Sequence, residues 1–176
     1  MVDLGFDTKA LLGLVEHLKA NPEAAVTSWK ATTKWDGGFR SHASIARPDK
    51  THEVQMDEPS PLGGTDTAPN MVEVVLGAYG CCLTTGLVAN AAVRGIELTG
   101  VDIDVEGEID LRAFLGLADP TQVAPGYSEI RTNVKLTAPG ATNEELHELY
   151  DHVLKTSPVG SVLASPVAVK GNLSIG

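Results

Sequence analysis

The stretch from Val74 to Val93 carries no formal charge and is long enough, as a helix, to span a bilayer. Small residues spaced along it could also form the packing face of a membrane helix. Its Gly, Thr and Asn residues make it only weakly hydrophobic, and it is the one such stretch in a chain whose other segments are amphipathic. We therefore expect a buried helix of a soluble protein, without a membrane partner.

The same stretch contains the only two cysteines, Cys81 and Cys82. A thiol is the side chain here that could act as a strong nucleophile or redox centre near neutral pH. Adjacent helical side chains point about 100° apart, so these two cannot form a disulfide with each other. Composition alone favours two small buried hydrophobes. Nearby glycines, Gly77, Gly80 and Gly86, each cost a helix about 1 kcal/mol relative to alanine, which indicates close approach of another backbone or room for a ligand.

The formal net charge of −10 narrows the classes of partner. An acidic chain repels phosphate backbones and anionic membrane surfaces, so we expect no nucleic-acid or membrane binding. Two adjacent cysteines make no disulfide framework, and the N-terminal residues lack a secretory pattern. The expected location is the cytoplasm.

The periodicity of the first part of the chain predicts one helix followed by strands. Asp7 can cap the helix, which Asn21-Pro22 ends. Alternation on both sides of the turn Asp36-Gly37-Gly38 predicts two strands. The expected strands cover residues 29–35, 39–46 and 52–56. A loop over residues 58–70 leads to the cysteine-bearing helix, whose first turn would contain Pro69.

Alternation returns after Gly100, from Val101 to Leu111. The polar face of this strand carries five carboxylates: Asp102, Asp104, Glu106, Glu108 and Asp110. A line of carboxylates does not converge as calcium requires, so we expect a solvated face. The strand over residues 129–136 carries Arg131 and Lys135, and we expect it to pair with the acidic strand.

The remaining segments complete an α+β fold, with helices packed on antiparallel sheets. Thr142 and Glu145 form a capping-box pattern at the start of a helix over residues 143–155. A short turn or helix follows, and alternation over residues 167–175 predicts a last strand. His147 and His152 are expected on the surface of the helix, since their spacing fits one face poorly and zinc needs more ligands. No metal or cofactor is expected.

Several of these segments together resemble the OsmC/Ohr family. They are the helix VEVVLGAYGCC, the following AxxxGI, the alternating strand, the capped helix, the Ser-Pro-Val turn and the terminal strand. The resemblance covers roughly Trp29 to the end. It implies a single domain over residues 1–176, with a helical extension (1–24), a β lobe (25–66) and a cysteine-helix and αβ lobe (67–176). It also implies antiparallel sheets around a long central helix and an intertwined homodimer.

The resemblance places the reactive cysteine of the family on Cys82. The second family cysteine, in Cys-Pro-Val-Ser, is Ser157 here, which is similar to a branch that lacks the resolving cysteine. In peroxide-reducing members the first thiolate forms a sulfenic acid, and the second cysteine resolves it as a disulfide. The family arginine maps loosely onto Arg40, just after the Asp-Gly-Gly turn, where it would stabilise an anion near the thiol. The family acidic residue fits Glu73 imperfectly, by one position.

Two hypotheses about function follow, one an enzyme and the other a binding protein, together with an alternative in which the thiols have no function. The first is a thiol-dependent organic hydroperoxide reductase, with Cys82 as nucleophile, Arg40 as its electrostatic partner and an external thiol as reductant. The second is a non-catalytic dimer that binds a small apolar ligand near Cys82. In the third, both thiols are inert core residues, and Arg40 is an ordinary surface residue.

Overall fold

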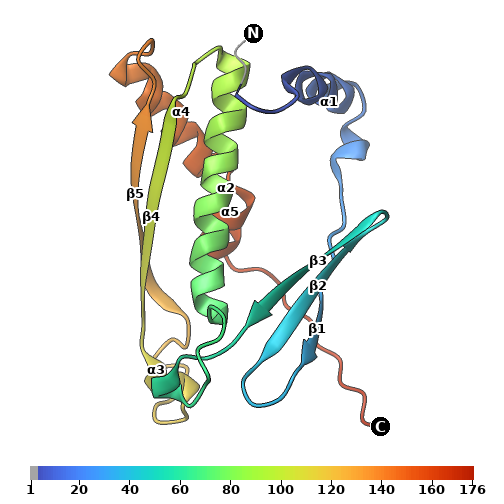
Figure 1. The fold of residues 1–176 in the computed structure, drawn as a ribbon, viewed down its shortest axis with the longest axis vertical. Helices are drawn as coiled ribbons and strands as arrows, with labels where there is room; N and C mark the ends of the chain where they lie inside the picture. The colour runs from blue at the N-terminus through green and yellow to red at the C-terminus, as the bar shows by residue number, and fades with distance from the viewer. Residues whose placement is uncertain (1–3) are drawn as a thin grey trace. The chain divides into compact units, whose positions relative to one another are not determined.

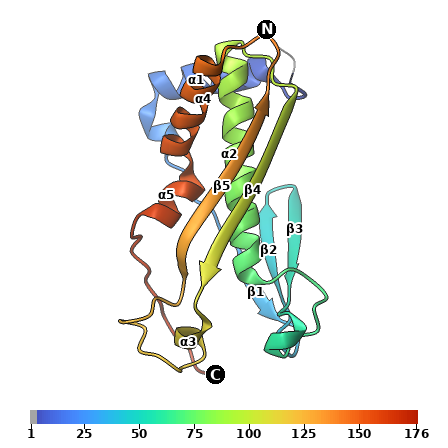
Figure 2. The same ribbon diagram turned by 90° about the vertical axis from the view of Figure 1, so that its left-hand side faces the viewer.

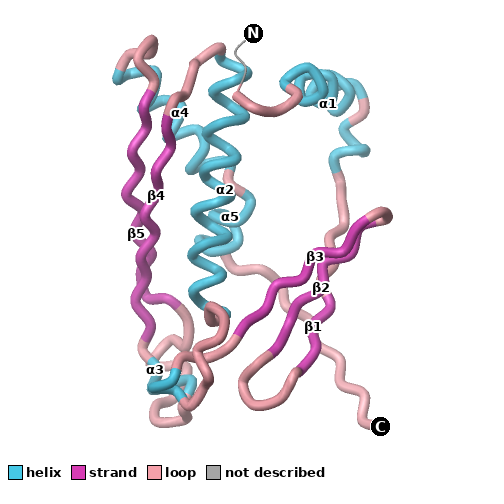
Figure 3. Tube along the Cα trace, in the orientation of Figure 1, coloured by secondary structure: helices cyan, strands magenta, loops and turns pink. Residues whose placement is uncertain are grey.

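The computed structural model describes residues 4–176, which form two compact units. One unit comprises residues 9–77, and the other comprises residues 4–8 with residues 78–176. Figure 1 labels the helices and strands, and Figure 3 separates them by type. The order of helices and strands is α+β, as the sequence patterns predict.

The unit of residues 9–77 contains a helix and a three-stranded sheet. Its elements are α1 (Thr8–Ala20), η1 (Pro22–Ala25), β1 (Thr32–Trp35), β2 (Ser41–Arg47), β3 (Lys50–Met56) and η2 (Ser60–Leu62). The sheet is antiparallel in the order β1-β2-β3, with Trp35 opposite Ser41 and Ser41 opposite Met56. Gly37 and Gly38 turn the chain between β1 and β2 with positive φ values of 95° and 59°. The predicted turn is confirmed, although β1 begins three residues later than expected.

A buried carboxylate organises the loop after β3. The Asp57 side chain is 1 % exposed and accepts hydrogen bonds from the hydroxyls and backbone N–H groups of Thr65 and Thr67. These bonds hold the pKa of Asp57 well below its ordinary value, the Thr65 hydroxyl being the largest cause. A Cβ at Gly64 would overlap the Glu58 carbonyl, so this loop requires glycine there.

Helix α2 (Met71–Arg94) begins at a cap that the sequence analysis did not recognise. The Asn70 side chain accepts from the Glu73 backbone N–H at 3.0 Å, and the Glu73 carboxylate accepts from the Asn70 N–H at 2.9 Å. Pro69 therefore precedes the helix, rather than lying in its first turn as predicted.

The unit of residues 78–176 consists of most of α2, a two-stranded sheet and three shorter helices. Its other elements are β4 (Gly100–Ile109), α3 (Leu111–Phe114), β5 (Tyr127–Thr137), α4 (Asn143–Thr156) and α5 (Pro158–Ala164). Figure 2 shows the β4–β5 pair running beside α2. β4 and β5 are antiparallel, with Asp102 opposite Lys135 and Glu106 opposite Arg131, so the predicted pairing of the acidic strand is confirmed.

The core of this unit lies between α2, α4 and the sheet. Its buried members are Leu83, Leu87, Ala91, Ile96, Leu98, Ala138, Leu149 and Val153. A Cβ on Gly86 would lie 2.7 Å from Val153 Cγ1, and one on Gly80 would lie 3.2 Å from Val105 Cγ2. Close approach therefore explains two of the three helix glycines, while Gly77 has no such neighbour within 4 Å. The predicted capping box of Thr142 and Glu145 is also present at the start of α4.

Two expectations about burial and pairing were wrong. Helix α2 is covered on one side only: its length and apolar composition would suit a membrane span, and only 17 % of its most apolar window is buried. The segment after α5 is not a strand, and Figure 3 draws it as loop to the C-terminus. Its apolar residues are exposed, among them Val169 and Ile175. A strand needs a neighbouring edge for its backbone hydrogen bonds, and this segment has none among the described residues.

Candidate functional site

The Cys82 sulfur lies 3.3 Å from the hydroxyl oxygen of Ser157. Cys82 is half-buried on α2, directly before Leu83 and about one turn before Leu87, and both leucines are buried. Ser157 follows α4, whose buried Leu149 and Val153 pack against the same core. The packing of α4 on α2 thus brings together two residues that are 75 positions apart in the chain.

Ser157 is 5 % exposed and caps α5. Its hydroxyl oxygen accepts a hydrogen bond from the Gly160 backbone N–H at 3.1 Å, and Pro158 occupies the first turn of that helix. The residue that the resemblance matches to the second family cysteine is therefore next to Cys82. A hydroxyl at this position can form a hydrogen bond with the sulfur, as donor or as acceptor, but it cannot form a disulfide.

Two tyrosines complete the surroundings, and the sequence analysis did not identify them. Burial raises the pKa of Tyr79, and the charges that Tyr150 and Cys82 can carry raise it further. The Tyr150 hydroxyl lies 3.3 Å from Thr132 Oγ1 on β5. The spacing of Tyr79 and Cys82, three residues apart on one helix, could have indicated that they share a face. Nothing local in the sequence indicates Tyr150.

A pocket of about 470 Å³ opens beside Tyr79. Its walls are Tyr79, residues 126–130, Gly160, Leu163 and Ala164. Tyr79 and Gly160 link it to the thiol region, because a Cβ on Gly160 would lie 3.1 Å from the Tyr79 ring and 3.2 Å from the Ser157 hydroxyl. The pocket can accept a small, largely apolar molecule.

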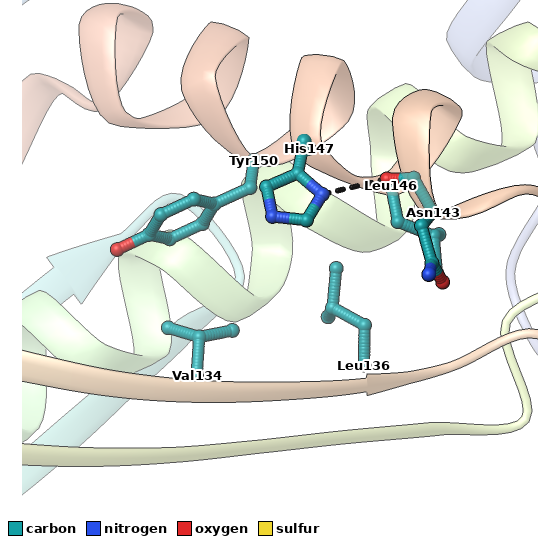
Figure 4. Close-up of a pocket in the computed structure, with 6 residues that line it drawn as sticks. All are labelled: Val134, Leu136, Asn143, Leu146, His147 and Tyr150. Atoms are coloured by element: carbon teal, nitrogen blue, oxygen red, sulfur yellow. Dashed lines mark hydrogen bonds between the residues drawn. The ribbon is translucent and has the colours of Figure 1, made fainter.

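A second pocket, of about 300 Å³, lies between β5 and α4. Figure 4 shows Val134 and Leu136 of β5 pointing towards Leu146, His147 and Tyr150 of α4. His147 Nδ1 lies 2.7 Å from the Asn143 carbonyl oxygen, so this nitrogen carries the proton and donates it. Cys82 is not part of the wall of this pocket.

Cys81 is exposed, so it is not the small packing residue that the sequence analysis favoured. Within a single chain this thiol is not a core residue, because the side of α2 that carries it is not covered. The inert-core alternative, in the form of a structural dimer, stays a prediction. Of the two cysteines, it is Cys82 whose sulfur contacts a polar side chain, that of Ser157.

Arg40 lies in the other unit, directly before β2. Its side chain is exposed and lines a polar pocket of about 540 Å³ with Asp36, Ser41 and His42. His42 Nδ1 contacts the Asp36 carboxylate at 2.6 Å. The pairing of Arg40 with Cys82 stays a prediction. Glu73, the imperfect match to the family acid, uses its carboxylate for the cap of α2.

Among residues 4–176, no group of three or more His, Cys, Asp or Glu side chains is arranged to hold a metal ion. The carboxylates of β4 from Asp102 to Glu108 are exposed, and Arg131 of β5 contacts Glu108 of β4 at 2.8 Å and Glu129 of its own strand at 3.2 Å. His147 and His152 are exposed on α4, as predicted.

Comparisons with a family model and with solved structures both point to OsmC-like proteins. The family model described as OsmC-like protein matches residues 64–171, more than half of the chain. No curated protein matches the chain in sequence. Among solved structures, an OsmC-like protein from Mycoplasma pneumoniae is 17 % identical with a TM-score of 0.65, covering 78 % of this chain and 88 % of that one. The organic hydroperoxide resistance protein OsmC from Legionella pneumophila is 19 % identical with a TM-score of 0.55, covering 78 % and 91 %.

Proposed function

We propose that this chain, which belongs to the OsmC-like family, reduces organic hydroperoxides through the Cys82 thiol and takes its reducing equivalents from an external thiol. The observation that carries the proposal is the 3.3 Å contact between Cys82 Sγ and Ser157 Oγ at the two positions that match the family cysteines. The Legionella pneumophila neighbour is named for organic hydroperoxide resistance. A role in the response to oxidative stress, in the cytoplasm, is part of the proposal.

The first step is attack of the Cys82 thiolate on the distal oxygen of the hydroperoxide. An S–O bond forms, the O–O bond breaks, and the alkoxide takes up a proton to leave as the alcohol. Sulfur is oxidised to the sulfenic acid, and the peroxide is reduced. The pocket beside Tyr79, with Ile130 and Leu163 in its walls, favours an apolar organic group over hydrogen peroxide.

The second half of the cycle requires a partner thiol, because Ser157 cannot resolve the sulfenic acid. A small thiol attacks the sulfenic sulfur, which releases water and leaves a mixed disulfide on Cys82. A second thiol then attacks the mixed disulfide, regenerates Cys82 and leaves as the oxidised disulfide. Cys81, on the adjacent position of the same helix, has the wrong geometry for this step unless the helix unwinds.

The proposal includes a homodimer, with a second copy covering the bare side of α2. Exposed Val75, Cys81 and Val93 on an apolar helix leave a surface that a lone soluble chain rarely presents. Light scattering coupled to gel filtration should give twice the chain mass. A monomer at micromolar concentration would contradict this part of the proposal.

Peroxide consumption with the two cysteines exchanged separately tests the proposed chemistry. Reduced protein is mixed with cumene hydroperoxide and excess dithiothreitol, and peroxide loss is followed. Cys82→Ser should abolish the catalysed loss, whereas Cys81→Ser, the matched control one residue away, should retain it. Consumption by the wild type no faster than by an ordinary free thiol would refute the peroxidase.

The role of Arg40 is tested in the same assay. Arg40→Ala should slow Cys82 oxidation, because a cation near the thiol stabilises the anionic sulfur and the developing alkoxide. Arg47→Ala is the control: Arg47 is the last residue of β2, the strand that Arg40 precedes, and its guanidinium lies over the Trp29 ring at 5.8 Å. Equal rates for both variants would remove Arg40 from the proposed site.

The alternative function is a dimer that binds a small apolar ligand without turnover. The pocket beside Tyr79 and the serine that stands at position 157 in place of a resolving cysteine favour it. In that case the Cys82→Ser protein should still release an organic molecule on denaturation, detected by mass spectrometry, and the wild type should consume no peroxide.

A further inference from the structure

The Ser157 hydroxyl has two neighbours, and they divide its hydrogen-bonding capacity. Gly160 donates its backbone N–H to the oxygen at 3.1 Å, which uses a lone pair. The Cys82 sulfur lies 3.3 Å from the same hydroxyl oxygen. A hydroxyl has a single hydrogen to donate. With the oxygen accepting from Gly160, that hydrogen is available to the sulfur.

The burial of Ser157 strengthens this contact. The side chain is 5 % exposed, so bulk water competes little for its hydrogen. A hydrogen bond to an ionised group is about twice as strong as one between neutral groups, and more so in a dry environment. An anionic Cys82 sulfur would therefore be stabilised selectively over the neutral thiol.

We propose that Ser157 is a positioning residue of the Cys82 site: it donates its hydroxyl hydrogen to the thiolate and holds the sulfur in one orientation beside α5. The proposal rests on the proposed function only in taking Cys82 as the reacting thiol. A cysteine at this place would be a weaker donor and would be oxidised in turn. Serine supplies the donor and leaves Cys82 as the one redox group at this contact.

A merely structural role must be separated from this one, since Ser157 also caps α5. Glycine is tolerated at a helix N-cap much better than alanine, but it has no donor. Threonine retains both the cap and the donor. The series Ser157→Ala, Ser157→Gly and Ser157→Thr therefore varies the cap and the donor separately. A Cys81→Ala background leaves Cys82 as the only thiol.

The rate of Cys82 alkylation by iodoacetamide distinguishes the roles and needs no peroxidase activity. We expect Ser157→Ala and Ser157→Gly to react about three- to tenfold more slowly than Ser157 at pH 7, since less sulfur is ionised, partly offset by higher intrinsic nucleophilicity. At about pH 10, where ionisation no longer limits the rate, this slowing should disappear, and Ser157→Ala and Ser157→Gly should react as fast as Ser157 or up to about threefold faster. Ser157→Thr should restore the rate at pH 7.

The opposite pattern overturns the proposal. If Ser157→Gly reacts as fast as Ser157 at pH 7, or if the glycine variant is slowed equally at both pH values, Ser157 acts through packing or the cap alone. Circular dichroism of each variant establishes that it folds. A normal alkylation pattern in a protein that consumes no peroxide would refute the peroxidase and leave the role of Ser157 intact.

Discussion

Replacing Ser157 by cysteine should convert the Cys82 site into one that forms an internal disulfide. Cys82 Sγ and Ser157 Oγ already lie 3.3 Å apart, and a disulfide requires about 2.05 Å between its two sulfurs. The longer C–S bond of cysteine shortens the gap that remains. We expect Ser157→Cys, treated with one equivalent of cumene hydroperoxide, to lose both thiols at positions 82 and 157 together.

The size of the effect on stability follows from the separation of the two residues. A cross-link between positions 75 residues apart removes loop-closure entropy from the unfolded chain worth about 4.5 kcal/mol at 25 °C. This is an upper value, because distortion of the native geometry subtracts from it. At about 2–4 °C per kcal/mol for a chain of this size, the oxidised variant should melt up to about 9–18 °C above its reduced form.

Thiol counting and peptide mapping under non-reducing conditions measure the cross-link, and calorimetry with and without dithiothreitol measures the change in Tm. The Cys81→Ala background excludes a bond from Cys81, and Cys82→Ala with Ser157→Cys is the unlinked control. Oxidation of Cys82 to a sulfenic acid that persists, with the thiol at position 157 still free, would refute the geometry.

Four further substitutions test the core of residues 78–176 and the buried carboxylate of residues 9–77. Leu87→Ala should cost about 2–5 kcal/mol in urea unfolding, because Leu87 is fully buried in the core. Gly86→Ala should cost about 1–3 kcal/mol, since its Cβ would lie 2.7 Å from Val153 Cγ1, and Val153→Ala should relieve part of that cost. The lowered pKa of Asp57 contributes stability that is present above about pH 4 and lost as pH falls towards the folded pKa; Asp57→Asn should flatten this acid dependence of the urea midpoint.

Most of the fold could be predicted because its signals are local. Alternation identified β4 and β5, and the opposite charges of Glu106 and Arg131 identified their pairing. The glycine pattern predicted close approach of another backbone or room for a ligand, whereas at Gly86 it is the side chain of Val153 that approaches α2. The cap formed by Asn70 and Glu73 was visible in the spacing of these residues and was missed.

The predictions that were wrong concern the surroundings of a segment, which its own residues do not determine. An apolar helix does not reveal which of its sides is covered, so the exposure of Cys81 could not be read from its neighbours. Alternation over residues 167–175 shows strand propensity, but a strand also needs an edge to pair with. The contact of Cys82 with Ser157 joins distant parts of the chain, and only the family resemblance indicated it.

The half-covered helix α2 has a consequence for how this protein behaves on dilution. In the proposed dimer, a second copy covers the apolar side that carries Cys81 and Val93, so association would contribute to the free energy of folding. The melting temperature would then rise with protein concentration by mass action. Below the dissociation constant of the proposed dimer, the same apolar surface would be exposed to water on every chain, and the abundance of the protein in its cell would help to determine its stability.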